Sequence, residues 1–340
     1  MKILSVDDSI IVRSLIKRAL SELSIVELVE TAASSFVARE KIESQSFDLI
    51  ISDVNMPEIS GIEFLESLIA DNIKTPVVFF SSMSVDSIES SLKALNLGAL
   101  DIVPKPEGIP EKEIFKYIQD KISPYFSLEK PTAKTVKTEI KIEADIVERI
   151  SAVGIGASTG GPRAIEQFLK QITDLHIPMF ISVHMPDQFI IQFAQRLNKE
   201  CSFEVKVGEE GDIVSSNCCY LSHGGKSLQV ERQRLEVVLK YCDRPGPGNI
   251  YPGVDPLLES IAEVYDKNAL AVVLSGMGED GLIGSRKIKA EKGTVLVQDE
   301  STCSVYGMPK AVFNAGLADG VYPITSLGMK VASLISKRRW

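Results

Sequence analysis

Residues 47–53 read Phe-Asp-Leu-Ile-Ile-Ser-Asp, and this stretch decides how the first part of the chain folds. Three apolar residues follow one another without the polar alternation of a half-exposed strand, and an aspartate closes the run. Continuous apolar strands are typical of a parallel sheet that helices cover on both faces. Similar short runs occupy residues 3–6, 77–80 and 101–103. The first region therefore predicts an α/β fold with a parallel sheet.

Helical periodicity separates these runs. Between residues 12 and 23, apolar side chains recur every three or four positions, as on the buried face of an amphipathic helix. The second half of the chain shows the same pattern. It has apolar runs at residues 152–155, 178–183 and 270–274 and an apolar helical face over 165–172. We predict an α/β fold class with two doubly wound parallel-sheet domains.

The segment between the two regions has a different composition. Residues 123–147 are rich in Lys, Thr and Glu and show little amphipathic pattern, which is typical of a linker. We therefore predict a first domain over residues 1–122, a linker over 123–147 and a second domain over 148–338.

The composition fits a cytoplasmic protein. A chain of 340 residues that is 44% hydrophobic can bury two cores. The formal net charge of -9 argues against nucleic acid as a partner. No apolar stretch reaches the roughly 18–20 residues that span a bilayer, and the apolar start is too short for a signal peptide. We expect no membrane insertion. The odd number of cysteines, without metal-binding spacing, indicates reduced thiols: Cys201, Cys218, Cys219, Cys242 and Cys303.

Charged and hydroxyl side chains stand at the ends of the predicted strands in the first region. Asp7, Asp8 and Asp53 each follow an apolar run, Ser81 ends the third run and Lys105 follows the fourth. Because carboxyl ends of parallel strands meet at one sheet edge, these groups should gather there. Clustered carboxylates repel one another unless a hard cation lies among them, and Mg²⁺ meets that need. One such residue alone could be an ordinary polar strand end, but the ordered set predicts a phosphoryl-acceptor site.

The residues around these side chains resemble a response-regulator receiver domain over about residues 1–122. The motifs are Val6-Asp7-Asp8-Ser9, Asp53-Val54-Asn55-Met56-Pro57 followed by Gly61, and Lys105-Pro106. The resemblance implies a flavodoxin-like fold in which Asp53 is phosphorylated. It also implies that Asp8, Asp53 and the backbone carbonyl of Asn55 hold Mg²⁺, with Asp7 acting through water.

In the same resemblance, Ser81 and Lys105 bind the phosphoryl oxygens. Ile102 departs from the pattern, since many receivers carry an aromatic switch residue there. This departure argues against an aromatic-flip mechanism and not against phosphorylation.

A candidate nucleophile opens the second region. Residues 156–161 read Gly-Ala-Ser-Thr-Gly-Gly and lie between a predicted strand and a predicted helix. This is the Gly-x-Ser-x-Gly pattern in the strand–turn–helix context that exposes a serine hydroxyl, here that of Ser158. A glycine-rich phosphate-binding turn would use the same context, but no lysine follows as in a P-loop.

A serine nucleophile needs a base, and the chain has three histidines. His184 directly follows a predicted strand, at the same sheet edge as Ser158. His176 precedes that strand and His223 lies in a glycine-rich turn. Asp280 follows the strand at residues 270–274 and is the candidate acid that orients the base.

Glu279 is the neighbouring alternative to Asp280. The order Ser…His…Asp differs from the Ser…Asp…His order of α/β-hydrolases, so we do not expect that fold.

The second region resembles the catalytic domain of chemotaxis protein-glutamate methylesterases (CheB-type) over about residues 148–338. Beside the motif at 156–161, the matching motifs are His184-Met185-Pro186, Gly276-Met277-Gly278-Glu279-Asp280-Gly281, Gln298-Asp299-Glu300 and Tyr306-Gly307-Met308-Pro309. The resemblance implies a Rossmann-like domain with Ser158 as nucleophile, His184 as base and Asp280 as orienting acid. The backbone N–H groups of Met277 and Thr159 would form the oxyanion hole.

The same resemblance implies chemoreceptors as the substrate and the sensor histidine kinase of the chemotaxis system as the phosphodonor. The reaction would hydrolyse glutamate methyl esters, and some family members also deamidate glutamines. Two alternatives remain: a hydrolase for another substrate, or a response regulator with a non-catalytic output domain.

One segment departs from the second family pattern. Family members typically carry Arg and His where residues 243–255 here are rich in Pro and Gly, and Pro and His where this chain has His223 and Ser227. We expect this segment to form the rim of the substrate cleft around Tyr251. With Arg244 as its one basic residue, the rim should attract acidic receptor helices only weakly.

Overall fold

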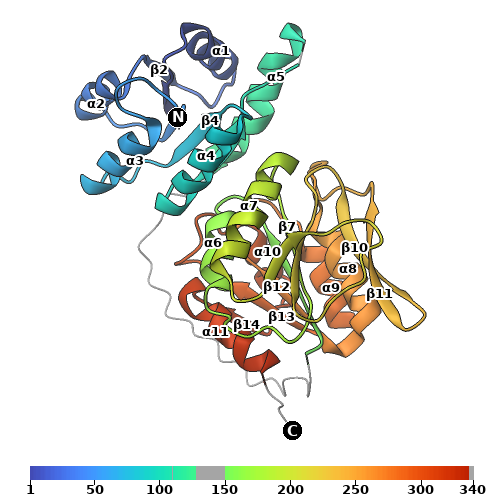
Figure 1. Ribbon diagram of the computed structural model, residues 1–340. Helices are drawn as coiled ribbons and strands as arrows, with labels where there is room; N and C mark the ends of the chain where they lie inside the picture. The colour runs from blue at the N-terminus through green and yellow to red at the C-terminus, as the bar shows by residue number, and fades with distance from the viewer. Residues whose placement is uncertain (109, 128–149, 337–340) are drawn as a thin grey trace. The chain divides into compact units, whose positions relative to one another are not determined.

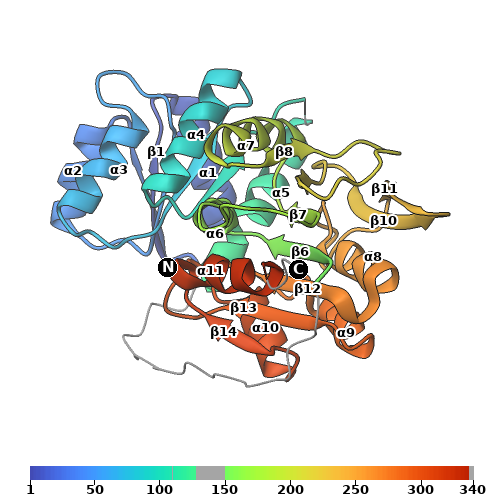
Figure 2. The ribbon, with the colours of Figure 1, turned by 60° about the horizontal axis from the view of Figure 1, so that its bottom comes forward.

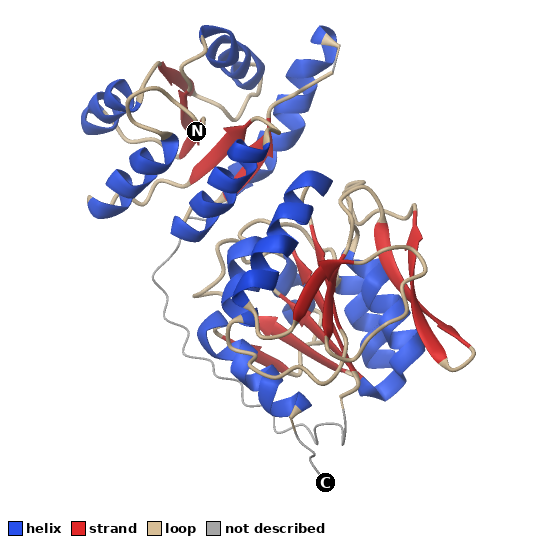
Figure 3. Cartoon of the chain, in the orientation of Figure 1, coloured by secondary structure: helices blue, strands red, loops and turns tan. Residues whose placement is uncertain are grey.

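The computed structural model describes residues 1–108, 110–127 and 150–336. The chain divides into two compact units, Met1–Thr132 and Ala133–Trp340 (Figure 1). In each unit, helices enclose a central sheet (Figure 3). No helix in the described ranges is long and apolar enough to cross a membrane.

The first unit is built on five parallel strands in the order β2-β1-β3-β4-β5. This is the flavodoxin-like order, in which ligands bind outside the carboxyl ends of the strands. The α/β prediction is confirmed, although β2 was not foreseen because its five residues include the polar pair Glu30 and Thr31 and form no continuous apolar run. The strands are β1 (Lys2–Val6), β2 (Leu28–Ala32), β3 (Leu49–Ser52), β4 (Val77–Ser81) and β5 (Asp101–Pro104).

Five helices cover this sheet, and α1 packs against α5 while α3 packs against α4. Serines begin four of them, because a serine hydroxyl accepts a backbone N–H that the first turn leaves unpaired. The helices are α1 (Ile10–Ser21), α2 (Ser35–Ser44), α3 (Gly61–Ala70), α4 (Val85–Leu97) and α5 (Glu111–Ile122).

The folded part of the first unit continues into the predicted linker. Residues Ser123–Ser127 form a short 3-10 helix, η1. The ring of Tyr125 is buried, and its hydroxyl donates to Asp101 Oδ2 at 3.0 Å. These contacts tie the first five linker residues to the sheet, whereas residues 128–147 of the predicted linker lie outside the described ranges.

The second unit is built on seven parallel strands in the order β14-β13-β12-β6-β7-β9-β8. The chain starts in the middle at β6, runs outward through β7 to β8 and β9, and returns to the other side at β12. The switch point therefore lies between β6 and β12. The strands are β6 (Ala152–Ala157), β7 (Met179–Val183), β8 (Glu204–Val207), β9 (Cys218–Leu221), β12 (Ala269–Val273), β13 (Thr294–Gln298) and β14 (Gly320–Tyr322).

Helices lie on both faces of this sheet. The helices α6 and α11 contact each other on one face, and α8 packs against α9 on the other (Figure 2). The doubly wound prediction is thus confirmed here as well. The helices are α6 (Gly161–Leu169), α7 (Asp187–Glu200), α8 (Val254–Tyr265), α9 (Leu282–Ala290), α10 (Met308–Asn314) and α11 (Ile324–Ile335), with the 3-10 turn η2 (Asp266–Asn268).

An antiparallel hairpin, which the sequence did not predict, lies beside α8 (Figure 1). It consists of β10 (Ser227–Gln233) and β11 (Glu236–Cys242). Its inner face adds buried apolar side chains, among them Leu228 and Leu239, to the core around α8. The hairpin therefore holds the helix whose N-terminus reaches the candidate site described next.

Candidate functional site

The three catalytic candidates of the second unit meet at one edge of the sheet. Ser158, His184 and Asp280 follow β6, β7 and β12, which are neighbours around the switch point. His184 Nδ1 lies 3.0 Å from Ser158 Oγ, and His184 Nε2 lies 2.9 Å from Asp280 Oδ2. The structure therefore joins the three residues in one hydrogen-bonded chain.

The state of the imidazole follows from its two neighbours. Because the carboxylate of Asp280 can only accept a hydrogen bond, Nε2 carries the proton. In neutral imidazole this leaves Nδ1 with a lone pair facing the hydroxyl of Ser158. The histidine side chain is only 7% exposed, so few water molecules compete for that hydrogen bond.

The turn that carries Ser158 is tight, and neighbouring residues pack closely against it. The carbonyl of Ser158 accepts the N–H of Gly161 at 2.6 Å, and the N–H of Ser158 donates to the carbonyl of Ser275 at 3.0 Å. Gly160 has a φ of 73° and lies against Ser304, so a side chain there would be strained and would collide. Glycine is required at this position to turn the chain from β6 into α6.

Asp280 is buried and held at the start of α8. Its oxygens accept the backbone N–H groups of Val254 at 2.8 Å, Asp255 at 2.9 Å and Gly281 at 2.9 Å. Burial alone would raise the pKa of Asp280, but His184 and the N–H groups of Val254 and Asp255 lower it. Asp280 is therefore an ionised acceptor for His184, whereas the alternative acid Glu279 is exposed.

The divergent segment, residues 243–255, packs directly against the side chain of Asp280. A Cβ added at Gly246 would lie 2.1 Å from Asp280 Oδ2, so only glycine fits there. Arg244 forms an ion pair with Glu259, and the Tyr251 hydroxyl donates to the carbonyl of Asp243 at 2.5 Å. Sequence reasoning treated this segment as a cleft rim and missed that it supports the candidate acid.

Sequence reasoning also missed Asp255, which is 3% exposed and lies beside Asp280. Its Oδ1 accepts the N–H of Gly284 at 2.8 Å. Burial, with further contributions from the charges of Asp280 and Glu259, raises the pKa of Asp255 to about 6. The sequence did contain a signal for this residue, because Asp255 is an acidic residue in the first turn of the otherwise apolar helix α8.

The other two histidines have partners elsewhere. His223 Nδ1 lies 2.8 Å from Asp187 Oδ1, and the imidazole stands edge-on to Tyr241. His176 Nε2 lies 2.7 Å from Asp174 Oδ2, and its side chain is half exposed. Of the three histidines, His184 is the one that contacts Ser158.

The acidic candidates of the first unit also lie together. One carboxylate oxygen from each of Asp7, Asp8 and Asp53 can be chosen so that all three lie within 4.8 Å of one another. Lys105 Nζ lies 2.6 Å from Asp53 Oδ2 and 2.9 Å from Asp7 Oδ2. Burial would lower the pKa of Lys105, but its two carboxylate partners raise it. Since one ammonium cannot balance three carboxylates, this oxygen donor set fits a divalent cation such as Mg²⁺.

Ser81 and Asn55 stand beside this cluster and belong to a network of hydroxyl groups. Ser81 ends β4, and its backbone carbonyl accepts the N–H of Lys105 at 2.8 Å. Its hydroxyl oxygen accepts a hydrogen bond from Ser91 at 3.0 Å. The side chain of Asn55 donates to Ser87 Oγ at 2.7 Å. Both serine partners lie on α4, so the network connects the cluster to that helix.

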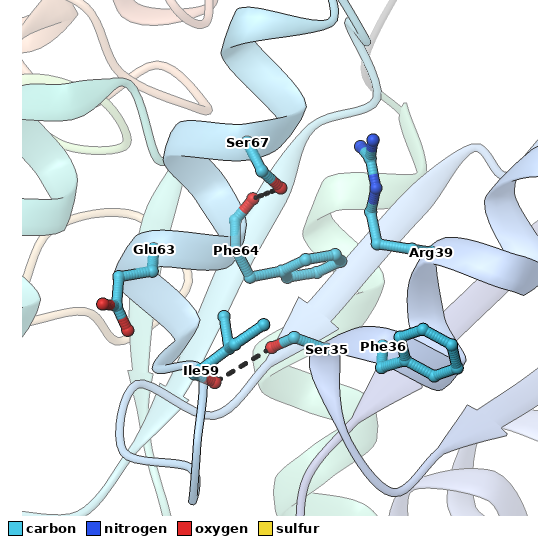
Figure 4. A pocket seen from close by; sticks show the side chains of 7 residues that line it. All are labelled: Ser35, Phe36, Arg39, Ile59, Glu63, Phe64 and Ser67. Carbon is cyan, nitrogen blue, oxygen red and sulfur yellow. Dashed lines mark hydrogen bonds between the residues drawn. The ribbon is translucent and has the colours of Figure 1, made fainter.

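A separate pocket of about 420 Å³ lies between α2 and α3. Figure 4 shows Phe36, Ile59 and Phe64 around it, with Arg39 near one end. Arg39 forms an ion pair with Asp71. None of the candidate residues discussed above lines this pocket, and we assign no chemistry to it.

Comparisons with known proteins agree for both units. The family model described as CheB methylesterase matches residues 153–331, and the model described as response regulator receiver domain matches residues 3–119. A protein of Trichodesmium erythraeum named protein-glutamate methylesterase/protein-glutamine glutaminase is 35% identical, covering 97% of this chain and 97% of its own length. A protein of the same name from Sulfurimonas denitrificans is 35% identical over 100% of this chain and 99% of its own.

A solved structure resembles the second unit. It is the crystal structure of the Thermotoga maritima CheB methylesterase catalytic domain, with 35% sequence identity and a TM-score of 0.53. The match covers 54% of this chain and 98% of that chain.

Proposed function

We propose a function on the premise that this chain belongs to the CheB methylesterase family and carries a response regulator receiver domain. It is a protein-glutamate methylesterase that acts in chemotactic adaptation and is regulated through its receiver. The single observation that supports the chemistry best is the hydrogen-bonded chain from Ser158 through His184 to Asp280.

In the proposed reaction, Ser158 Oγ attacks the carbonyl carbon of a glutamate methyl ester while His184 Nδ1 takes the hydroxyl proton. Asp280 holds Nε2–H and stabilises the imidazolium. The backbone N–H groups of Met277 and Thr159 stabilise the oxyanion. The carbon–methoxy bond breaks, and His184 returns the proton to the leaving oxygen, which gives methanol and an acyl-enzyme.

Water then attacks the acyl carbonyl with His184 again as base, which restores the Ser158 hydroxyl and leaves a glutamate. The same attack on a glutamine side chain would release ammonia in place of methanol. We therefore include deamidation of receptor glutamines in the proposal, in agreement with the names of the relatives.

The receiver is proposed to accept a phosphoryl group on Asp53 from the sensor histidine kinase of the chemotaxis system. Asp8, Asp53 and the backbone carbonyl of Asn55 would hold Mg²⁺, with Asp7 acting through water. When bound, the cation supplies positive charge that stabilises a phosphoryl group in transfer. Lys105 and Ser81 would hold the phosphoryl oxygens at the ends of β5 and β4.

We further propose that the enzyme works in the cytoplasm with chemoreceptors as its substrates, and without nucleic acid or membrane insertion. The cysteines of the described ranges support a reducing compartment, since all five are free. Burial raises the pKa of Cys201 and Cys218 to about 11, so these thiols stay protonated and unreactive. The proposed domain division remains residues 1–122, 123–147 and 148–338.

The test is methanol release from methyl-labelled receptor membranes, with and without a small-molecule phosphodonor and Mg²⁺. The wild-type chain should release methanol faster with the phosphodonor, and Asp53→Asn should keep the basal rate and lose the stimulation. Hydrolysis of simple esters without release of methanol from the receptor would instead identify a hydrolase for another substrate. No hydrolysis of either would favour a non-catalytic output domain.

A further inference from the structure

The loop from Asp299 to Gly307 joins β13 to α10 and lies behind the residues proposed for the oxyanion hole. The carbonyl of Gly276 accepts the N–H of Gly307 at 3.0 Å and the N–H of Met308 at 2.9 Å. Gly276 itself lies against the nucleophile, since a Cβ added there would come 2.9 Å from Ser158 Cβ. The end of this loop therefore fixes a peptide group beside Ser158.

Because the peptide group is planar, the direction of the Gly276 carbonyl also fixes the direction of the Met277 N–H. In a trans peptide the carbonyl and the following N–H point in opposite directions, and the one cis bond in the described ranges is Tyr251–Pro252. Because the Gly276 carbonyl faces Gly307 and Met308, the N–H of Met277 must point away from them. In the described part of the chain, this N–H donates to no protein group.

The second donor is oriented in the same way. The carbonyl of Ser158 accepts the N–H of Gly161 at 2.6 Å, so the N–H of Thr159 points in the opposite direction. The next peptide is fixed by Ser275, whose buried hydroxyl donates to the Thr159 carbonyl at 2.8 Å and accepts the N–H of Val305 at 3.1 Å. The loop thus contacts the peptide that carries the Met277 N–H directly and, through Ser275, the peptide that follows the one carrying the Thr159 N–H.

Gly307 leaves no room for a side chain. A Cβ at this position would lie 2.7 Å from the Gly276 carbonyl oxygen and 3.0 Å from the Gly278 nitrogen. Its φ of -102° and ψ of -70° are negative angles, outside the left-handed region, so alanine would meet little backbone strain. An added methyl group at Gly307 would therefore push residues 276–278 out of position.

We propose that Gly307 and Ser275 are positioning residues that preform the oxyanion hole through the carbonyls of Gly276 and Thr159. The proposal rests on the proposed function in that Ser158 must be the nucleophile and the N–H groups of Met277 and Thr159 must form the oxyanion hole. Neither residue touches the substrate. Gly307 sets the direction of the Met277 N–H, and Ser275 holds the peptide that follows the Thr159 N–H. Both contacts are in place before the substrate arrives, which is how a preorganised hole stabilises a developing charge.

The experiment measures covalent labelling of Ser158 by a fluorophosphonate probe in the full-length protein. Ser158 Oγ forms a bond to phosphorus, fluoride leaves, and His184 takes the serine proton, while the phosphoryl oxygen occupies the oxyanion hole. Gly307→Ala should lower the maximal labelling rate at least about tenfold, as loss of oxyanion stabilisation does. The probe concentration that gives the half-maximal rate should change less than about twofold, since initial binding is unaffected.

Gly293→Ala is the matched control. Its added methyl would lie 2.8 Å from the carbonyl oxygen of Ala269, at the opposite end of β12 from Gly276. It should lower the melting temperature as Gly307→Ala does and leave the labelling rate unchanged. Should Gly307→Ala fail to fold, Ser275→Ala takes its place, because it frees the Thr159 carbonyl without adding an atom.

The outcomes separate the two proposals. Labelling of folded Gly307→Ala or Ser275→Ala at the wild-type rate, with Ser158→Ala unlabelled, would overturn the positioning role and leave the nucleophile in place. An unlabelled wild-type protein, or equal labelling of Ser158→Ala, would overturn the proposed nucleophile and this inference together.

Discussion

Asp255 donates its backbone N–H to Asp280 Oδ1 at 2.9 Å, and its own carboxyl group is buried beside that carboxylate. The two acids differ in their partners. His184 and the backbone N–H groups of Val254 and Asp255 lower the pKa of Asp280, whereas burial and nearby negative charge raise the pKa of Asp255 to about 6. The site therefore keeps one carboxylate ionised at the cost of its neighbour.

This pair makes stability depend on pH. Between about pH 4 and pH 6, the folded state holds a proton on Asp255 that the unfolded chain has lost, so stability falls as pH rises through this window. Asp255→Asn removes this effect while its side-chain oxygen can still accept the Gly284 N–H. The unfolding free energy of the variant, minus that of the wild type, should rise by about 3 kcal/mol from pH 4 to pH 7.

Denaturant unfolding at several pH values measures this difference. Asp243→Asn, an exposed aspartate of the same segment, is the control and should leave the pH dependence of the wild type. A difference that stays constant across the window would show that Asp255 is ionised in the folded state.

Replacing the orienting acid should lower turnover and leave binding intact. In Asp280→Asn, an amide replaces the acceptor that holds Nε2–H, so His184 loses the tautomer that activates Ser158. We expect kcat to fall about 10⁴-fold with little change in KM. The exposed neighbour Glu279→Gln should keep the wild-type rate, and a larger loss in Glu279→Gln than in Asp280→Asn would transfer the role to Glu279.

Recognition by the divergent segment should depend weakly on salt. Arg244 already pairs with Glu259, so little of its charge is available to steer an acidic helix, while Tyr251 holds the segment through the Asp243 carbonyl. We expect Tyr251→Ala to lower kcat/KM on methylated receptor more than Arg244→Ala does. Rate measurements at low and physiological ionic strength check this, and a steep fall with Arg244→Ala as the worse variant would restore electrostatic recognition.

Receiver control should be inhibitory in the absence of phosphate. A tether keeps the receiver at high effective concentration near the catalytic domain, and phosphorylation of Asp53 would shift that equilibrium. Residues 148–340 alone should therefore hydrolyse receptor esters faster than the unphosphorylated full chain. Equal initial rates at equal enzyme concentration would exclude inhibition of this kind.

The strongest sequence signals predicted the sheet centres and the residues at their carboxyl ends. Residues 49–52 and 152–157 are short buried runs bounded by turn residues, which favours strands over helices. Ser158 and His184 follow such strands directly, and Asp280 lies in the loop after a third. The strands β2, β8 and β14 were missed, since the runs are brief and partly exposed. The buried strands β9 and β13 were also missed; both are short, and β13 begins with Thr and ends with Gln. Backbone contacts were also invisible, because the closeness of Gly246 to Asp280 depends on tertiary packing and not on side-chain pattern.

The central claim is that Ser158 is the nucleophile of a receptor methylesterase. The most direct measurement incubates purified wild type, Ser158→Ala and the surface control Ser202→Ala with methyl-esterified receptor, and quantifies methanol released and glutamate formed. We predict that wild type and Ser202→Ala form methanol and glutamate in equal amounts and at the same rate. Ser158→Ala should be slower by about 10⁴-fold or more, with the melting temperature of the wild type. Near-wild-type release by Ser158→Ala would contradict the account.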